Sequence, residues 1–159
     1  MLYVPAMTYS NAQPPFIPVH SLRHELHRLH PIGAVLDGGM YRASEFAPRT
    51  GPFIETAYHP DDGYHAALVD TDTFNPLYLR GVYLIFITGT LRDAVANRPA
   101  LVRTINGGGR FGFVEQVTRD AVLFKSPRIG QSPPPAIRRD EVEMVFVPMG
   151  KMDAAWIAK

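Results

Sequence analysis

Residues Arg98–Lys125, RPALVRTINGGGRFGFVEQVTRDAVLFK, decide the fold of this chain. The apolar, β-rich run Ala100–Ile105 predicts a strand. Asn106–Gly109 predicts a chain reversal, because Asn and Gly tolerate positive φ. The extended run Phe111–Val117 and, after a short turn, the apolar Ala121–Lys125 predict two more strands. This stretch therefore predicts a meander of short antiparallel strands.

Composition favours a packed globular protein, since 46% of the 159 residues are hydrophobic. The chain has no cysteine, which excludes disulfides and thiolate metal sites and fits the cytoplasmic location that we expect. The N-terminus lacks the pattern of a signal peptide. The longest apolar run, Val82–Ile87, is far shorter than the roughly 20 residues of a membrane span, so no membrane association is expected.

The formal net charge of +1 argues against a strongly electropositive nucleic-acid binder. The charge is unevenly distributed, however. The first 97 residues hold six basic and nine acidic side chains, whereas the remaining residues hold ten basic and six acidic ones. Any nucleic-acid contact is therefore expected in the second half.

The two halves of the chain share an order of features that predicts a duplication. The matched pairs are Ser21-Leu22-Arg23 with Thr90-Leu91-Arg92, Asp37-Gly38-Gly39 with Asn106-Gly107-Gly108, Ala66–Leu68 with Ala121–Leu123, and Val82–Ile87 with Val142–Val147. We predict an N-terminal arm (1–20), two repeats (21–89 and 90–150) and a C-terminal helix (151–159). Short helices are expected at Ser21–Leu29, Thr90–Asn97 and Lys151–Ala158.

The last strand of each predicted repeat is apolar on both faces. Val82–Ile87 and Val142–Val147 lack the alternation that a one-sided sheet requires. Each strand must therefore be covered on its outer face, either by the other repeat or by another chain.

Pro99–Lys125 resembles the Sm1 motif of Hfq and other Sm-like proteins, and Arg138–Pro148 resembles their shorter Sm2 motif. The matching features are the proline before the first strand, the Asn106-Gly107 turn, and Gly112 inside a long second strand. The resemblance implies a mainly β protein with short helices. It would contain two tandem Sm-like barrels, which are SH3-like, strongly bent and five-stranded, each preceded by a short helix.

The resemblance also implies self-association, because Sm-like units pair their fourth and fifth strands into rings. Two units per chain would let a trimer form a pseudo-hexamer. The function implied is a non-catalytic, Hfq-like RNA-binding or RNA-chaperone ring with altered RNA pockets and without a cofactor. The family's RNA-contacting positions fall here on Arg103, Gly108, Asp120 and Arg139-Asp140. The alternative is a structural or assembly ring, from a phage or a large complex, that does not bind RNA.

The candidate RNA-binding residues are cations of the second half, because phosphate contacts need such groups. They are Arg98, Arg103, Arg110, Arg119, Arg138 and Arg139. The alternative is a solvated surface with local salt bridges, for example to Glu141 and Glu143. Asn106–Arg110 resembles a phosphate loop in composition, but it lacks the following Lys-Ser/Thr and is better explained as a hairpin turn.

Histidines at positions 20, 24 and 27 would share one face of the predicted first helix. Such spacing permits metal chelation, and a histidine-dependent metal enzyme is a third class of function. His20, His24 and His27 are weak candidates, because the same pattern fits an exposed face of an amphipathic helix. We therefore expect no metal.

Overall fold

The computed structural model describes residues 26–45, 50–152 and 157–158. Its strands are β1 (His27–Leu29), β2 (Pro31–Val35), β3 (Met40–Ala43), β4 (Phe53–Thr56), β5 (Tyr64–Val69), β6 (Tyr83–Gly89), β7 (Pro99–Thr104), β8 (Gly108–Val117), β9 (Ala121–Phe124), β10 (Ile137–Arg138), β11 (Val142–Met152) and β12 (Ile157–Ala158). Single 3₁₀ turns are η1 (Asp37–Gly39), η2 (Pro60–Asp62), η3 (Leu91–Asp93) and η4 (Arg139–Glu141). The expected mainly β class is confirmed.

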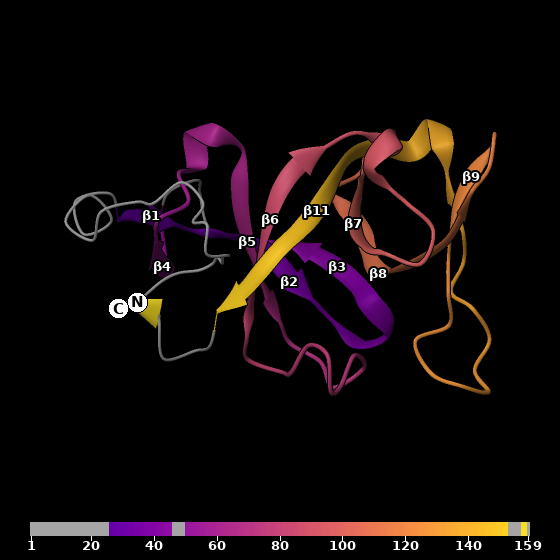
Figure 1. Ribbon diagram of the computed structural model, residues 1–159, viewed down its shortest axis with the longest axis horizontal. Coiled ribbons are helices and arrows are strands. Elements are labelled where there is room, and N and C mark those ends of the chain that lie inside the picture. Colours follow the sequence, from indigo (N-terminus) through magenta and orange to yellow (C-terminus); the bar gives the residue numbers. More distant parts are fainter. Residues whose placement is uncertain (1–25, 46–49, 153–156, 159) are drawn as a thin grey trace, which may run out of the picture.

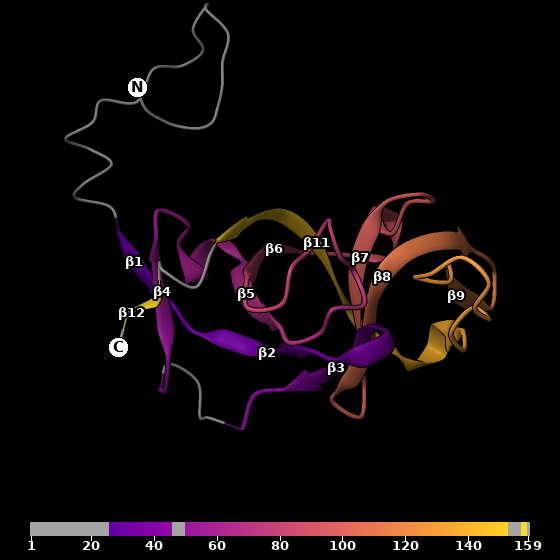
Figure 2. The ribbon, with the colours of Figure 1, turned by 90° about the horizontal axis from the view of Figure 1, so that it is seen from below.

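Seven strands close a barrel in the order β8, β3, β2, β5, β6, β11, β7 and back to β8 (Figures 1 and 2). Neighbouring strands are antiparallel except β2 and β5, which run parallel. The first half of the chain supplies β2, β3, β5 and β6, and the second half supplies β7, β8 and β11. One barrel is therefore built from both halves.

Smaller units flank this barrel on two sides (Figure 1). The long β8 leaves the barrel after Phe113 and pairs from Val114 onward with β9, which in turn pairs with β10. On the other side, β4 pairs with β1 and β12 in a separate three-stranded sheet.

Three hydrophobic cores follow from this arrangement. The barrel interior is filled by Val35, Tyr41, Ala67, Val69, Phe74, Val82, Leu84, Phe86, Leu101, Phe111 and Phe146. A second core joins β7, β8 and β11 to β9 and β10, and includes Val114, Val122 and Phe124. A third core joins the outer faces of β5 and β6 to β1 and β4.

The prediction of two-faced strands is confirmed. On β6, Leu84 and Phe86 face the barrel interior, whereas Tyr83 and Ile85 belong to the third core. On β11, Phe146 faces the barrel interior and Val145 faces the second core. The outer face of β6 is covered by residues of the first half and that of β11 by residues of the second, so the cover comes from the same half and not, as predicted, from the other repeat or another chain.

The predicted helices are wrong in the described residues. His27–Leu29 pairs with β4, because Leu29 enters the third core as part of a ladder. Lys151 and Met152 continue β11 opposite β6, and β12 follows where the terminal helix was expected. Thr90 does cap a helical turn through its reciprocal bonds with Asp93, but the turn ends at once because the next residue is buried in the second core.

Two tandem barrels, one in each half, are not confirmed. Ala66–Leu68 was matched with Ala121–Leu123, yet β5 pairs with β2 and β6 whereas β9 pairs with β8 and β10. The parallel pair β2–β5 has no counterpart in the second half, where β7 is antiparallel to both neighbours. The arm 1–20 and residues 21–25 lie outside the described residues. In the described part of the chain, no helix has the length and apolar character needed to cross a membrane.

Candidate functional site

The six arginines nominated from the sequence lie on different parts of the molecule. Arg103 is on β7 and Arg110 on β8, and Arg98 precedes β7. Arg119, Arg138 and Arg139 meet at one corner, which we call the arginine corner. The candidates therefore do not converge on a single site.

Two of these arginines serve the barrel. The Nε of Arg103 donates to Glu143 Oε1 at 3.0 Å, and its guanidinium carbon lies 5.3 Å from the centre of the Phe146 ring. Arg110 donates through Nη1 to the Gly38 carbonyl at 2.8 Å, and burial lowers its pKa. Both guanidinium groups are thus held by neighbouring strands and turns of the barrel.

The arginine corner carries acidic groups as well. Arg138 forms a bidentate pair with Asp140, with both N···O distances at 3.1 Å, and lies 3.8 Å from Glu141. Arg139 donates to the Thr118 carbonyl at 3.2 Å, which fixes η4 against the β8–β9 turn. Arg98 and Arg119 are exposed and have no side-chain partner among the described residues. The interpretation as a solvated surface with local salt bridges fits Arg103 and Arg138.

The histidine arrangement does not form a metal site in the described residues. His20 and His24 lie outside these residues, and His27 lies on a strand with its ring 4.1 Å from that of His59. His59 accepts the backbone N–H of Asp61 through Nδ1 at 2.9 Å. No group of three potential metal-ligating side chains occurs in the described part of the chain.

His65 lies at the end of the barrel where β5 begins. Its Nε2 and Thr88 Oγ1 share a hydrogen bond of 3.1 Å, and its ring packs edge-on against Phe146 at 5.2 Å. Burial lowers the pKa of His65, and the nearby charge of Arg103 lowers it further. The neutral imidazole is therefore the form that the fold stabilises.

We expect the fold to lose stability on acidification through this group. Because the pKa of His65 is lower in the folded than in the unfolded state, the unfolded chain binds more protons below about pH 6.5. Stability is fully present above that pH and falls as the pH drops toward the folded pKa. Urea denaturation at neutral and acidic pH measures the loss, and His65→Gln is expected to reduce it; an unchanged pH dependence in this variant contradicts the assignment.

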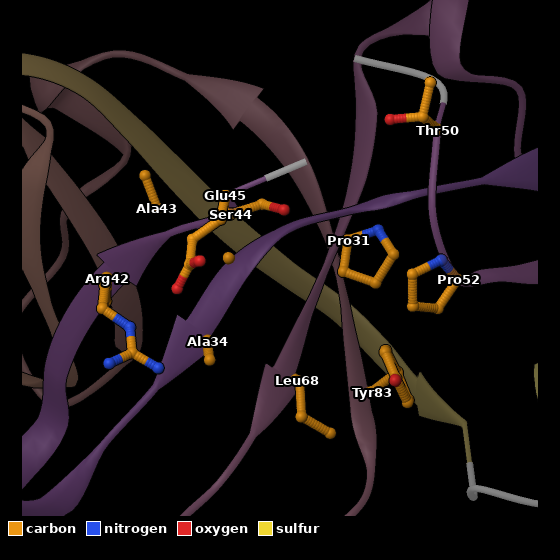
Figure 3. A pocket seen from close by; sticks show the side chains of 11 residues that line it. Pro31, Ala34, Arg42, Ala43, Ser44, Glu45, Thr50, Pro52, Leu68 and Tyr83 are labelled. Atoms are coloured by element: carbon orange, nitrogen blue, oxygen red, sulfur yellow. The ribbon is translucent and has the colours of Figure 1, made fainter. Parts of the chain in front are cut away.

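A pocket of about 540 Å³ lies on the outside of the barrel, over the outer faces of β2, β3, β5 and β6. We call it the Arg42 pocket. It is lined by Pro31, Gly33, Ala34, Arg42, Ala43, Ser44, Glu45, Thr50, Pro52, Leu68 and Tyr83. Arg42 and Glu45 lie on one side and Pro31 and Pro52 on the other (Figure 3). Its volume is within the range of about 300–1,000 Å³ that is usual for ligand pockets.

Three polar groups of the Arg42 pocket are available to a ligand, namely Arg42, Glu45 and the Tyr83 hydroxyl. Arg42 and Glu45 are exposed and form no ion pair or hydrogen bond with the described residues. Tyr83 is only 7% exposed, and its hydroxyl has no hydrogen-bond partner in the described part of the chain. Burial raises the pKa of Tyr83, so the hydroxyl keeps its proton.

A second pocket, of about 420 Å³, lies where η1 meets the loop between β5 and β6 and residues Arg128 and Gln131. Most charged side chains of this second pocket already form ion pairs or hydrogen bonds with other residues of the chain. Arg80 bonds to Asp70 at 2.9 Å and to Asp72 at 3.4 Å, and Asp37 accepts the hydroxyl of the fully buried Thr71 at 2.7 Å. These contacts fix the loop against η1, so the Arg42 pocket is the better candidate for binding.

Sequence reasoning missed the residues of the Arg42 pocket. Arg42 lies on β3, Glu45 follows that strand and Tyr83 begins β6, so the three residues give no motif along the chain. The signal present was the alternation on the strand at Met40–Ala43, where Tyr41 is buried and Arg42 is exposed. The pocket appears only after β2 has been paired with β5, which brings Ala34 beside Leu68.

The Arg42 pocket thus combines one cation, one carboxylate and one buried hydroxyl over small apolar side chains. Its ligand has to be inferred from that chemistry, and the resemblance to Sm-like proteins rests on the sequence motifs alone. No protein-family model matches the chain, and a search of the curated proteins finds no relative.

Proposed function

We propose that the protein is a non-catalytic binding module that holds its ligand in the Arg42 pocket and does not hold RNA on its arginines. The observation that carries this proposal is the group of unpartnered polar side chains in that pocket. Arg42, Glu45 and the Tyr83 hydroxyl are free to bond a ligand. Tyr83 lines the pocket and its hydroxyl has no hydrogen-bond partner among the described residues, so this hydroxyl is available to a ligand that carries an acceptor.

Three of the nominated arginines already form contacts within the chain, which favours a ligand other than RNA. Binding to a nucleic-acid backbone draws its free energy from cations that replace counterions along the phosphates. Arg103 and Arg138 are already paired with carboxylates, and Arg110 bonds a backbone carbonyl. A phosphate backbone would have to compete with these contacts at the three arginines, and of the six nominated only the side chains of Arg98 and Arg119 lack a partner among the described residues.

The strand pairing also bears on the expected ring. In Sm-like rings the fifth strand offers an edge to the neighbouring unit. The corresponding β11 is paired with β7 on one side and with β6 of the same chain on the other. A ring closed through β11 would have to displace β6, so we expect the mass of a single chain in solution light scattering; a mass of three chains would support the ring instead.

The absence of RNA binding is tested with the purified protein. We expect a 260/280 absorbance ratio free of nucleic acid, and fluorescence anisotropy with a uridine-rich oligonucleotide showing nothing tighter than the roughly 10⁻⁴–10⁻⁶ M of non-specific binding at physiological salt. Saturable binding well below that range would reject the proposal.

RNA binding at the arginine corner is the second candidate function, because three arginines gather there. In that case Arg139→Ala should weaken oligonucleotide binding and lower the slope of log K against log salt by about 1. Arg42→Gln is the matched control, since it removes one positive charge from the other site. Equal effects of the two variants would show that binding depends on net charge and not on the corner.

A further inference from the structure

Resting on the proposed function, we infer that the ligand of the Arg42 pocket is an extended peptide segment of a partner protein. This segment places an acidic side chain at Arg42, a basic side chain at Glu45 and a backbone carbonyl at the Tyr83 hydroxyl. The inference uses the charges, the buried hydroxyl and the apolar lining of the pocket together. Each of these features selects one part of the ligand.

The Tyr83 hydroxyl is the most informative of the three groups. It is buried with the third core around its ring, and desolvation is the cause of its raised pKa. By contrast, the hydroxyl of Tyr41, which is also buried, donates to the Ile32 carbonyl at 2.8 Å. A protonated phenol seeks an acceptor, and a peptide carbonyl is an acceptor that recurs along an extended chain.

The two charges set the pattern of side chains on the ligand. Arg42 lies on β3 and Glu45 lies at a bend just after that strand, so the two residues are three positions apart and their backbones are at most about 10 Å apart. A ligand with both signs is matched to this pair, whereas a phosphate chain would meet Glu45 as a repulsive group. The ligand's acidic and basic side chains are expected about the same number of residues apart.

The apolar lining favours a small aliphatic or proline residue between the charged side chains. Pro31 and Pro52 form one wall, and the Pro52 segment is fixed because its carbonyl lies 3.1 Å from His30 Nδ1. Ala34 has only a methyl side chain at the pocket, whereas a Cβ on Gly33 would point to the other face of β2 and meet the Tyr41 ring of the barrel interior. The extended backbone of the ligand can therefore approach β2 closely.

The binding test uses an array of blocked peptides with a Leu-Pro centre, in which one Glu and one Lys are placed two to five residues apart in both orders. We expect the full chain to bind a subset defined by spacing and order. Arg42→Gln, Glu45→Gln and Tyr83→Phe are each expected to weaken the best peptide about fivefold, as the loss of one exposed charge or one hydrogen bond would. Equal binding of a control peptide with neither charge overturns the inference.

A charge-swapped variant gives a sharper criterion. Arg42→Glu combined with Glu45→Arg keeps the net charge and reverses the polarity of the pocket. We expect this variant to prefer peptides with Glu and Lys exchanged. An unchanged preference, or binding of free dipeptides but not of blocked peptides, contradicts a partner-protein segment.

The two tyrosines provide a test without any ligand. Tyr83→Phe is expected to leave the urea midpoint of the free protein unchanged or to raise it, since it removes an unpaired buried hydroxyl. Tyr41→Phe is expected to lower the midpoint, because it removes a hydrogen bond. Equal losses in both variants would mean that Tyr83 is already bonded within the chain and would overturn the inference.

The outcomes separate this inference from the function on which it rests. An array without binders, together with a clean absorbance ratio, rejects the peptide ligand and leaves the binding module. Oligonucleotide binding that depends on Arg139 rejects the module itself.

Discussion

Gly39→Ala is expected to destabilise the fold by about 3 kcal/mol or more, whereas Gly38→Ala is expected to cost about 1 kcal/mol. Both residues have positive φ, +72° for Gly38 and +90° for Gly39, so both substitutions carry the penalty of a side chain in the left-handed region. Only at Gly39 would the new Cβ also meet backbone, namely the carbonyl oxygen of Phe111; at Gly38 the space is open.

The clash at Gly39 falls where the barrel closes between the halves. Gly39 leads into β3, whose residue Met40 pairs with Arg110 on β8. Relieving the contact would move β3 away from β8. Urea denaturation of the two variants side by side measures the difference in their free energies of unfolding. Equal losses would show that the positive φ alone decides the loss of stability and that β3 and β8 can move apart to relieve the contact.

The turns and strands were predictable because their signals are local. The predicted turn at Asn106–Gly109 does connect two strands, although Gly108 and Gly109 already belong to β8: the Gly107 N–H donates to the Thr104 carbonyl at 2.9 Å and Asn106 Oδ1 accepts from the Gly108 N–H at 3.0 Å. The two-faced pattern of Val82–Ile87 and Val142–Val147 correctly required cover on both sides. Periodicity reports how many faces of a strand are buried, and it does so without reference to distant residues.

The partners of each strand were not predictable in the same way. A duplicated pattern of apolar residues predicts the same topology twice, but β5 and β9 have different neighbours. Pairing is chosen by long-range contacts, and the pattern of Ala66–Leu68 is compatible with a parallel as well as an antiparallel partner. The helix predictions failed for a related reason. The cap at Thr90 starts a helical turn, but the chain leaves the helical conformation after Asp93, where Ala94 is buried in the second core.

The candidate site depended on the same long-range information. Single arginines could be nominated from their charge, but whether each is free depends on partners such as Glu143, 40 residues from Arg103. The Arg42 pocket depends on the pairing of β2 with β5 and on the approach of residues 50–52. Arg42 on β3 and Glu45 just after that strand carry no motif, so only the fold shows that they line a pocket.

Phe111→Ala is expected to remove about 3–5 kcal/mol of stability and to weaken both halves of the chain together. Phe111 is 1% exposed, and its ring lies 5.1 Å from Phe74, 5.5 Å from Tyr78 and 6.1 Å from Phe86. All three partners come from the first half, whereas Phe111 belongs to the second. The cavity would thus open at the centre of the shared barrel.

Amide hydrogen exchange distinguishes a shared barrel from two independent repeats. With one barrel, Phe111→Ala should reduce protection equally in β5 of the first half and in β7 of the second, because both lose the same global stability. Phe124→Ala, which opens the second core instead, is the matched control for loss of a buried phenyl ring. If Phe111→Ala left β5 protected while β7 exchanged freely, the halves would unfold separately, and the duplication predicted from the sequence would describe the folding units better than the closed barrel does.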